Sequence, residues 1–266
     1  QDYQMTLPTT CRLDDLLILR GIANNKTQAK AFIMAGLVFQ ENVRLDKPGK
    51  KVKTNIEIYV REKPHPWVSR GGIKLAHALE HFQIPIRKKV CMDIGASTGG
   101  FTDVLLFNGA QKVYAVDSGT GQLDWNLRNN DQVVVHERTN ARHLTIEQIP
   151  EAVEVITCDA SFISLTKILP TPLSFAKEAA FLIALIKPQF EANREQVRKG
   201  GVVRDPAVHR AVLVKVIEFA IELGLHPHSV VRSPLRGPAG NIEFLAKLDQ
   251  SGNVPTMNDL LAMAEI

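Results

Sequence analysis

The glycine-rich segment Asp93-Ile-Gly-Ala-Ser-Thr-Gly-Gly-Phe101 has the residue types of a loop that binds a small ligand. It continues an apolar run, and glycines let a backbone pass close beneath a ligand at the carboxyl end of a strand. Asp117 ends the next apolar run, where a carboxylate can accept hydrogen bonds from two ribose hydroxyls. The spacing differs from the dinucleotide pattern G-x-G-x-x-G, and Asp93 could meet an amino group. We therefore expect S-adenosylmethionine rather than NAD; the alternative is a tight strand-to-helix turn beside a surface acid. The expected cofactor contacts are Asp93, Gly95, Ala96, Ser97, Thr98, Gly99, Gly100, Phe101 and Asp117.

Four further residues could carry chemistry because they stand at the ends of predicted strands or at a helix start. Asp159 and Lys187 follow two apolar runs, and the carboxyl edge of a parallel sheet faces its ligand crevice. Lys74 lies at the start of an amphipathic helix, and Glu243 begins the last strand. Taken singly, Asp159 could be a helix cap and Lys187 a lysine whose stem packs on the sheet. Together, a Lys-Asp-Lys-Glu set on one sheet is typical of a catalytic group rather than of coincidence.

The elements that must position these residues alternate between strand and helix patterns. Strands are expected at 90–94, 112–116, 132–135, 153–157, 181–186, 228–232 and 241–248, and helices at 101–108 and from Asp205-Pro206 to just before Gly224. An acid at the N-cap followed by proline is a strong helix start. Short connections between alternating strands and helices predict an α/β, doubly wound, mostly parallel sheet.

A smaller module is expected ahead of this sheet. Helices at 12–19 and 25–34 precede strands at 37–39 and 56–60, which makes an α+β unit over residues 1–60. The proline-rich stretch 61–68 is expected to be a linker, 69–250 the larger domain and 251–266 a C-terminal tail.

The charge of the chain is concentrated in the smaller module. Residues 1–63 hold 11 Lys and Arg against 7 Asp and Glu, so they carry all of the formal net charge of +4. Such asymmetry favours a basic module that binds an anion, and the alternative is a solvated charged face. The candidate nucleic-acid contacts are Arg12, Lys26, Lys30, Arg44, Lys47, Lys50, Lys51 and Lys53.

Composition excludes several other classes. No apolar run is long enough to span a bilayer, and Gln1–Gln4 lacks the basic and apolar regions that begin a secretory signal. The three cysteines are odd in number and far apart, which argues against a disulfide framework and fits a reducing cytoplasm. No His/Cys cluster offers a metal site, so no metal is expected.

Five motifs in order carry a family resemblance. They are Ser69-Arg-Gly-Gly-Ile-Lys-Leu75, Asp93 to Asp103, Cys158-Asp-Ala-Ser-Phe-Ile-Ser-Leu165, Ile186-Lys-Pro-Gln-Phe-Glu191 and Lys199-Gly-Gly-Val-Val-Arg-Asp205. The chain resembles the hemolysin A (TlyA-type) proteins, ribosomal-RNA 2′-O-ribose methyltransferases related to the FtsJ methyltransferases. The resemblance extends from about Arg12 to Leu248.

This resemblance implies a Rossmann-like methyltransferase fold with a catalytic tetrad of Lys74, Asp159, Lys187 and Glu243. It also implies S-adenosylmethionine as the methyl donor, with Asn140 beside the adenine, and ribosomal RNA or ribosomal subunits as partners, with cytidine as the modified nucleotide. The smaller module resembles the alpha-L RNA-binding fold. Its second helix departs from that family's Ser-Arg start, because Lys26-Thr-Gln28 stands there.

A ribose 2′-hydroxyl is a poor nucleophile near neutral pH, so it must be oriented and must lose its proton during transfer. A lysine serves as the base only if burial or a neighbouring ammonium lowers its pKa. We hypothesise that Lys187 deprotonates the hydroxyl and that Asp159 orients Lys187. Lys74 and Glu243 would fix the substrate ribose. Two other functions stay open at this point, a non-catalytic RNA- or ribosome-binding protein and a membrane-active hemolysin.

Overall fold

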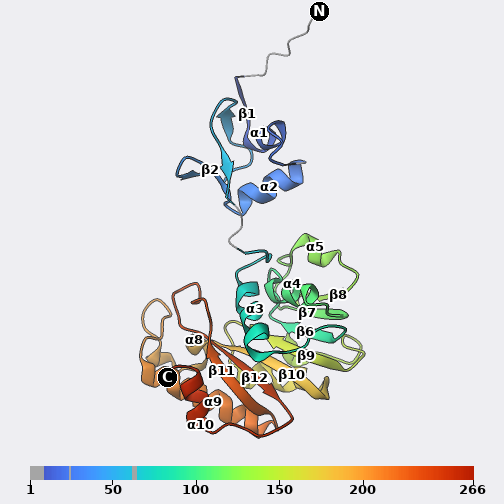
Figure 1. Ribbon diagram of the computed structural model, residues 1–266, viewed down its shortest axis with the longest axis vertical. Coiled ribbons are helices and arrows are strands. Elements are labelled where there is room, and N and C mark those ends of the chain that lie inside the picture. Colours follow the sequence, from blue (N-terminus) through green and yellow to red (C-terminus); the bar gives the residue numbers. More distant parts are fainter. Residues whose placement is uncertain (1–8, 24, 62–64) are drawn as a thin grey trace, which may run out of the picture. The chain divides into compact units, whose positions relative to one another are not determined.

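The computed structural model describes residues 9–23, 25–61 and 65–266, which fall into two compact units that meet between Pro66 and Trp67 (Figure 1). This boundary lies inside the stretch expected to be a linker. Residues 62–64 of that stretch, and the opening residues judged not to be a secretory signal, lie outside the described residues. The two units are considered separately.

The first unit packs two short helices on small antiparallel sheets. Its elements are β1 (Thr10–Arg12), α1 (Leu13–Leu19), α2 (Lys26–Met34), β2 (Val38–Gln40), β3 (Val43–Arg44), β4 (Lys51–Lys53) and β5 (Tyr59–Val60). Strand β1 pairs with β4, and β2 lies between β3 and β5. Apolar side chains of both helices are fully buried together, among them Leu13, Leu16 and Ile33. The two helices and the two strands expected from the sequence are present, although β5 is shorter than the expected strand at 56–60. Strands β1, β3 and β4 were not expected.

The second unit is built on a seven-stranded sheet. Its strands are β6 (Val90–Ile94), β7 (Lys112–Val116), β8 (Val133–His136), β9 (Val153–Cys158), β10 (Ala176–Ile186), β11 (His226–Arg232) and β12 (Phe244–Asp249). Their order is β11-β12-β10-β9-β6-β7-β8, with β12 antiparallel to both neighbours and every other neighbouring pair parallel. The predicted mostly parallel seven-stranded sheet is confirmed.

The helices of the second unit vary in length. They are α3 (Gly71–Phe82), α4 (Gly100–Phe107), α5 (Trp125–Arg128), α6 (Leu165–Ile168), α7 (Pro170–Leu173), α8 (Pro188–Glu191), α9 (Pro206–Glu222) and α10 (Met257–Met263), with 3-10 turns at Ala141–His143 and Arg194–Gln196. Helix α9 starts where the sequence predicted, because the Asp205 side chain accepts a hydrogen bond from the backbone N–H of Ala207 and Pro206 occupies the first turn.

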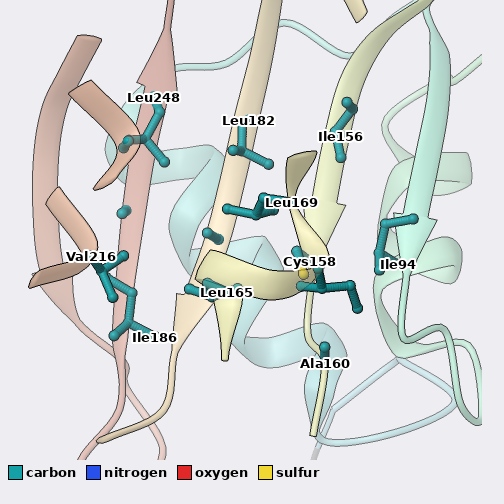
Figure 2. Close-up of a cluster of buried hydrophobic side chains, with 14 of the residues drawn as sticks. Ile94, Ile156, Cys158, Ala160, Leu165, Leu169, Leu182, Ile186, Val216 and Leu248 are labelled. Atoms are coloured by element: carbon teal, nitrogen blue, oxygen red, sulfur yellow. The ribbon is translucent and has the colours of Figure 1, made fainter. Parts of the chain in front are cut away.

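Successive residues of the central strands point to opposite faces, and each face is covered by helices. Cys91, Val155 and Ile183 pack with α3 and α4, whereas Met92, Ile156 and Leu182 pack with α6 and α9. Figure 2 shows the second of these layers, in which the strand residues Ile94, Ile156 and Leu182 belong to the same apolar cluster as Leu165, Leu169 and Val216. Because the strands are buried on both faces, their sequences are nearly continuous apolar runs.

The segment expected to be a C-terminal tail belongs instead to the core. Helix α10 packs against β11 and α9, and its Leu260 and Leu261 are each 1% exposed. The apolar residues of α10 would be exposed to water in a free tail, and burial of a leucine is worth about 1.5–3 kcal/mol. The larger domain therefore extends to the end of the chain described.

Candidate active site

Lys187 and Asp159 meet at the carboxyl edge of the sheet. Asp159 follows β9 and Lys187 follows β10, and the parallel register of these strands brings the two residues to the same edge. Lys187 Nζ lies 2.6 Å from Asp159 Oδ1 in an ion pair and donates a hydrogen bond to Ser161 Oγ at 2.9 Å. Burial raises the pKa of Asp159, and the charge of Lys187 opposes that increase. The ammonium is thus held in one place by two oxygens of one loop.

Lys74 and Glu243 form a second, more buried pair. Lys74 lies in the first turn of α3, and Glu243 precedes β12, whose Phe244 pairs with Ile186 across the sheet. Lys74 Nζ donates to Glu243 Oε2 at 2.5 Å, and the two side chains are 10% and 1% exposed. The antiparallel pairing of β10 with β12 places Glu243 beside Lys187, so all four predicted residues gather at one edge.

These four residues line a single cavity of about 700 Å³. Its wall also contains Ser69 and Arg70 ahead of α3, Phe190 of α8 and Arg236 of the loop before β12. A volume of this size is within the roughly 300–1,000 Å³ of small-molecule sites. The cavity therefore has room for a nucleotide beside two ion pairs.

The glycine-rich loop lies on the same cavity, next to Asp159. Gly95 has a φ of +80°, and a Cβ built there would lie 2.7 Å from the backbone oxygen of Asp159, so only glycine fits. The residues of the predicted cofactor loop that line the cavity are Gly95, Ala96, Ser97, Thr98, Gly100 and Phe101. Gly99 is the N-cap of α4, with its φ at +98°.

Asp117 faces a second cavity, of about 460 Å³, that shares Gly95, Ser97 and Asp159 with the first. Its two carboxylate oxygens accept hydrogen bonds from the backbone N–H groups of Ser97 and Gly119, each at 2.7 Å. Each oxygen keeps a further lone pair that can accept a hydroxyl. These bonds fix the carboxylate at the rim of the second cavity.

Asn140 also lines this second cavity, and its carbonyl oxygen accepts a hydrogen bond from the backbone N–H of Arg142. The cavity continues past Ala160 to Phe162, whose ring is 91% exposed and packs 5.1 Å from the ring of Phe190. Phe162 lines both cavities, so an exposed aromatic ring lies where the two join.

Asp93 does not reach either cavity, in contrast to the sequence expectation. Its side chain is fully buried and accepts hydrogen bonds from the hydroxyls of Thr102, at 2.8 Å, and Thr157, at 3.0 Å. Burial raises its pKa to about 7, although the two hydroxyls act in the opposite direction. Asp93 stands inside β6 rather than after it, so its carboxylate braces α4 and β9 from within the core.

Two residues that the sequence analysis missed hold the edge together. Ser161 binds Lys187 directly. Glu191, at the end of α8, is buried and accepts hydrogen bonds from the hydroxyl of Ser164 and the backbone N–H of Leu165. Glu191 thus ties the segment after β10 to the segment after β9. Both lie in the quoted motifs, but only the folded loop shows their partners.

The basic residues that the structure describes in the first unit are all exposed, but two of the predicted contacts are paired. Arg12 binds Asp14 at 2.9 Å, and Lys26 binds Asp15 at 2.9 Å, so part of the expected anion-binding charge is neutralised. The other predicted contacts, Lys30, Arg44, Lys47, Lys50, Lys51 and Lys53, make no ion pair within the described residues. Lys51 and Lys53 flank the buried Val52 on β4 and point to the same exposed side.

Within residues 9–23, 25–61 and 65–266, no group of three or more His, Cys, Asp and Glu side chains could hold a metal ion. In the same part of the chain, no helix is long and apolar enough to cross a membrane.

Comparisons with known proteins give consistent matches. The FtsJ-like methyltransferase family matches residues 67–250. The chain is 46% identical over 234 residues to the 16S/23S rRNA (cytidine-2′-O)-methyltransferase TlyA of Mycobacterium tuberculosis, covering 88% of this chain and 87% of that protein. It is 42% identical to hemolysin A of Brachyspira hyodysenteriae, covering 88% and 98% of the two chains. A Streptococcus thermophilus structure provisionally described as a hemolysin matches with a TM-score of 0.73 and 41% identity, over 97% of this chain and 96% of that one.

Proposed function

We propose that this chain, which belongs to the FtsJ-like methyltransferase family, transfers a methyl group from S-adenosylmethionine to a ribose 2′-hydroxyl of ribosomal RNA. The observation that supports this most directly is the pairing of Lys74 with Glu243 and of Lys187 with Asp159 around one cavity, next to a glycine-rich loop. The matching relative named TlyA supports ribosomal RNA as the substrate and cytidine as the nucleotide.

The residues present fit the proposed cofactor. S-adenosylmethionine supplies an electrophilic methyl group on its sulfonium. Gly95 lets the loop pass close against the backbone of Asp159, where a Cβ would not fit, and Asp117 offers two fixed oxygens for ribose hydroxyls. Asn140 lies on the same cavity as Asp117, where it would contact the adenine of a bound cofactor. Ser97 lines both cavities and donates its backbone N–H to Asp117, so this hydrogen bond links the loop to the acid.

The four paired residues would act on the ribose. Lys187, in its uncharged form, takes the proton of the 2′-hydroxyl, while Asp159 and Ser161 hold the lysine nitrogen in position. Lys74 and Glu243 line the same cavity and fix the ribose in line with the methyl group. Holding the two reacting groups in line removes much of the entropic barrier to transfer.

Features outside the tetrad favour RNA as the substrate. Phe162 presents an exposed ring at the junction of the two cavities, and aromatic side chains stack on unpaired bases of RNA. The unpaired lysines of the first unit supply positive charge for phosphates. A ribosomal substrate places the protein where ribosomes are, in the cytoplasm.

The test is methyl transfer from labelled S-adenosylmethionine to each purified ribosomal subunit, followed by mapping of the modified nucleotide. Lys187→Ala should lower the rate by about 100- to 10,000-fold, the usual worth of general base catalysis, with cofactor affinity retained. Lys177→Ala is the matched control, since Lys177 lies at the opposite end of β10 with a side chain 52% exposed. Near-normal transfer by Lys187→Ala would contradict the role of Lys187, and no transfer by the wild type to either subunit would contradict the function.

A further inference from the structure

A third cavity adjoins the large cavity that contains the two ion pairs, and two arginines line it. It has a volume of about 460 Å³, and its wall includes Arg204, His209 and Arg236. Arg236 and Ala239 line both this cavity and the large cavity that contains the two ion pairs. A chain-like substrate that enters the large cavity can therefore continue past Arg236 into the third cavity.

The two arginines of this cavity have no carboxylate partner. Arg204 makes no ion pair or hydrogen bond within residues 65–266, and Arg236 makes a single hydrogen bond, from Nη1 to the backbone oxygen of Gly240 at 3.2 Å. The nearby acid Asp205 is already used as the N-cap of α9, where it accepts from the backbone of Ala207. The cavity thus holds two guanidinium groups whose charges are not balanced locally.

The backbone that carries these arginines is firmly held. Asn241 is 1% exposed, accepts a hydrogen bond from the N–H of Val203 at 2.9 Å and donates one to the oxygen of Gly201 at 2.8 Å. The N–H of Gly240 closes a tight turn onto Gly237 at 2.8 Å. The segments before Arg204 and after Arg236 are therefore pinned to each other through one buried asparagine, which presets the cleft.

We propose that Arg204 and Arg236 form a phosphate subsite that binds the RNA backbone next to the target nucleotide. Guanidinium groups match phosphate geometry because they donate hydrogen bonds in a planar fork. Successive phosphates of an RNA strand are one nucleotide apart. Because the third cavity adjoins the cavity expected to hold the target ribose, a neighbouring phosphate of the same strand would lie near the two arginines. This subsite rests on the proposed function for its substrate, but its charge and position are independent of the methyl-transfer step.

The test compares Arg204→Gln, Arg236→Gln and the double variant with Arg210→Gln. Arg210 is an exposed arginine of α9 that lines none of the three cavities, so it controls for a general change of charge. Binding of a labelled single-stranded RNA oligonucleotide is measured from about 50 to 200 mM KCl, where the slope of log affinity against log salt counts phosphate contacts. Each cleft variant should reduce the slope by about 0.7 and weaken binding by about tenfold, whereas Arg210→Gln should bind RNA like the wild type.

Three further readouts separate the outcomes. Calorimetric binding of S-adenosylmethionine should be unchanged in Arg204→Gln and Arg210→Gln, because neither arginine lines the cavity beside the glycine-rich loop. The KM for ribosomal subunits should rise in Arg204→Gln with little change in kcat. Unchanged salt slopes in the double variant would overturn the subsite even if the wild type is active. A wild type that binds RNA with the expected slopes but transfers no methyl group would leave the subsite standing while the proposed function fails.

Competition identifies the anion. If inorganic phosphate stabilises the wild type but not the double variant while RNA slopes stay equal, the cleft binds free phosphate and the RNA subsite is wrong. If poly-glutamate binds more tightly than RNA and the same variants lose that binding, the cleft binds an acidic protein segment. That result would also overturn the RNA subsite. If RNA binds more tightly than inorganic phosphate and poly-glutamate, and the arginine variants weaken RNA binding, the RNA subsite is supported.

Discussion

The buried carboxylate of Asp93 predicts an unusual pH dependence of stability, which the substitution Asp93→Asn can isolate. The side chain is 0% exposed, and its partners are two neutral hydroxyls, from Thr102 and Thr157. Burial raises its pKa from 3.8 to about 7, because a charged carboxylate loses its hydration there. Asparagine has the same shape, keeps a carbonyl oxygen for one hydroxyl and does not titrate.

The sign of the effect follows from proton binding. Since the pKa is higher in the folded state, the acid contributes its stability fully below about pH 4 and loses it as the pH rises through about 7. The gap between the ordinary value of 3.8 and about 7 corresponds to roughly 4 kcal/mol, at about 1.36 kcal/mol per pH unit. The free energy of unfolding of the wild type, relative to Asp93→Asn, should therefore fall by up to about 4 kcal/mol between about pH 4 and pH 8.

The assay is urea unfolding followed by tryptophan fluorescence. Both tryptophans, Trp67 and Trp125, belong to the second unit, so the signal reports the unit that contains Asp93. A difference between wild type and Asp93→Asn that stays flat with pH would refute the burial argument. Subtracting the two proteins removes the contribution of other titrating groups such as Asp159.

Cofactor binding separates the core role of Asp93 from the contact expected from the sequence. Asp93→Asn should bind S-adenosylmethionine nearly as well as the wild type. Asp117→Asn is the control, because Asp117 lines a cavity and holds Ser97; it should weaken cofactor binding. A tenfold or greater loss of affinity in Asp93→Asn would show that the carboxylate reaches the cofactor.

Three further predictions follow from the two units. Gly95→Ala should cost about 1–2 kcal/mol of stability from its positive φ alone and should abolish cofactor binding by calorimetry, since the new Cβ would lie 2.7 Å from a backbone oxygen. Lys74→Met should cost about 3–5 kcal/mol in urea unfolding because Glu243 is left buried and unpaired, and adding Glu243→Gln should recover part of the loss. The double variant Lys51→Gln/Lys53→Gln should lower the salt slope of RNA binding by up to about 1.4 in filter-binding assays, with cofactor affinity unchanged as the control.

Much of the fold could be predicted because its signals are local. Helix α9 follows from an acid, a proline and a closing glycine that lie within one sequence window. The first part of β10 was missed, since Ala176–Ala180 carries Lys177 and Glu178 and joins the strand through a register shift rather than through an apolar pattern. Strand β1 was missed because its three residues pair with Lys51–Lys53, far along the chain. A short stretch of sequence does not reveal pairing with so distant a segment.

The sequence predicted those site residues that directly follow a strand. It did not predict the roles of residues that depend on which way a side chain points. Asp159 and Lys187 follow their strands, so the parallel sheet alone places them at one edge. Asp93 lies one residue inside a strand that is buried on both faces, and an unbroken apolar run does not reveal which way each side chain points. Glu191 and Ser161 act through loop contacts that form only after the strands are placed.

The charges of the site also explain why its substrate needs contacts beyond the tetrad. Lys74 is paired with Glu243 and Lys187 with Asp159, so the four residues together add no net charge to the cavity. A polyanion gains little long-range attraction from such balanced pairs, because the field of each cation is largely cancelled by its partner. Cations without an ion pair in the described part of the chain include Arg204 and Arg236 beside the cavity, and Lys51 and Lys53 in the first unit. Variants of the tetrad should therefore change the rate of transfer and leave the salt dependence of RNA binding as it is, whereas variants of the arginines and lysines should do the reverse.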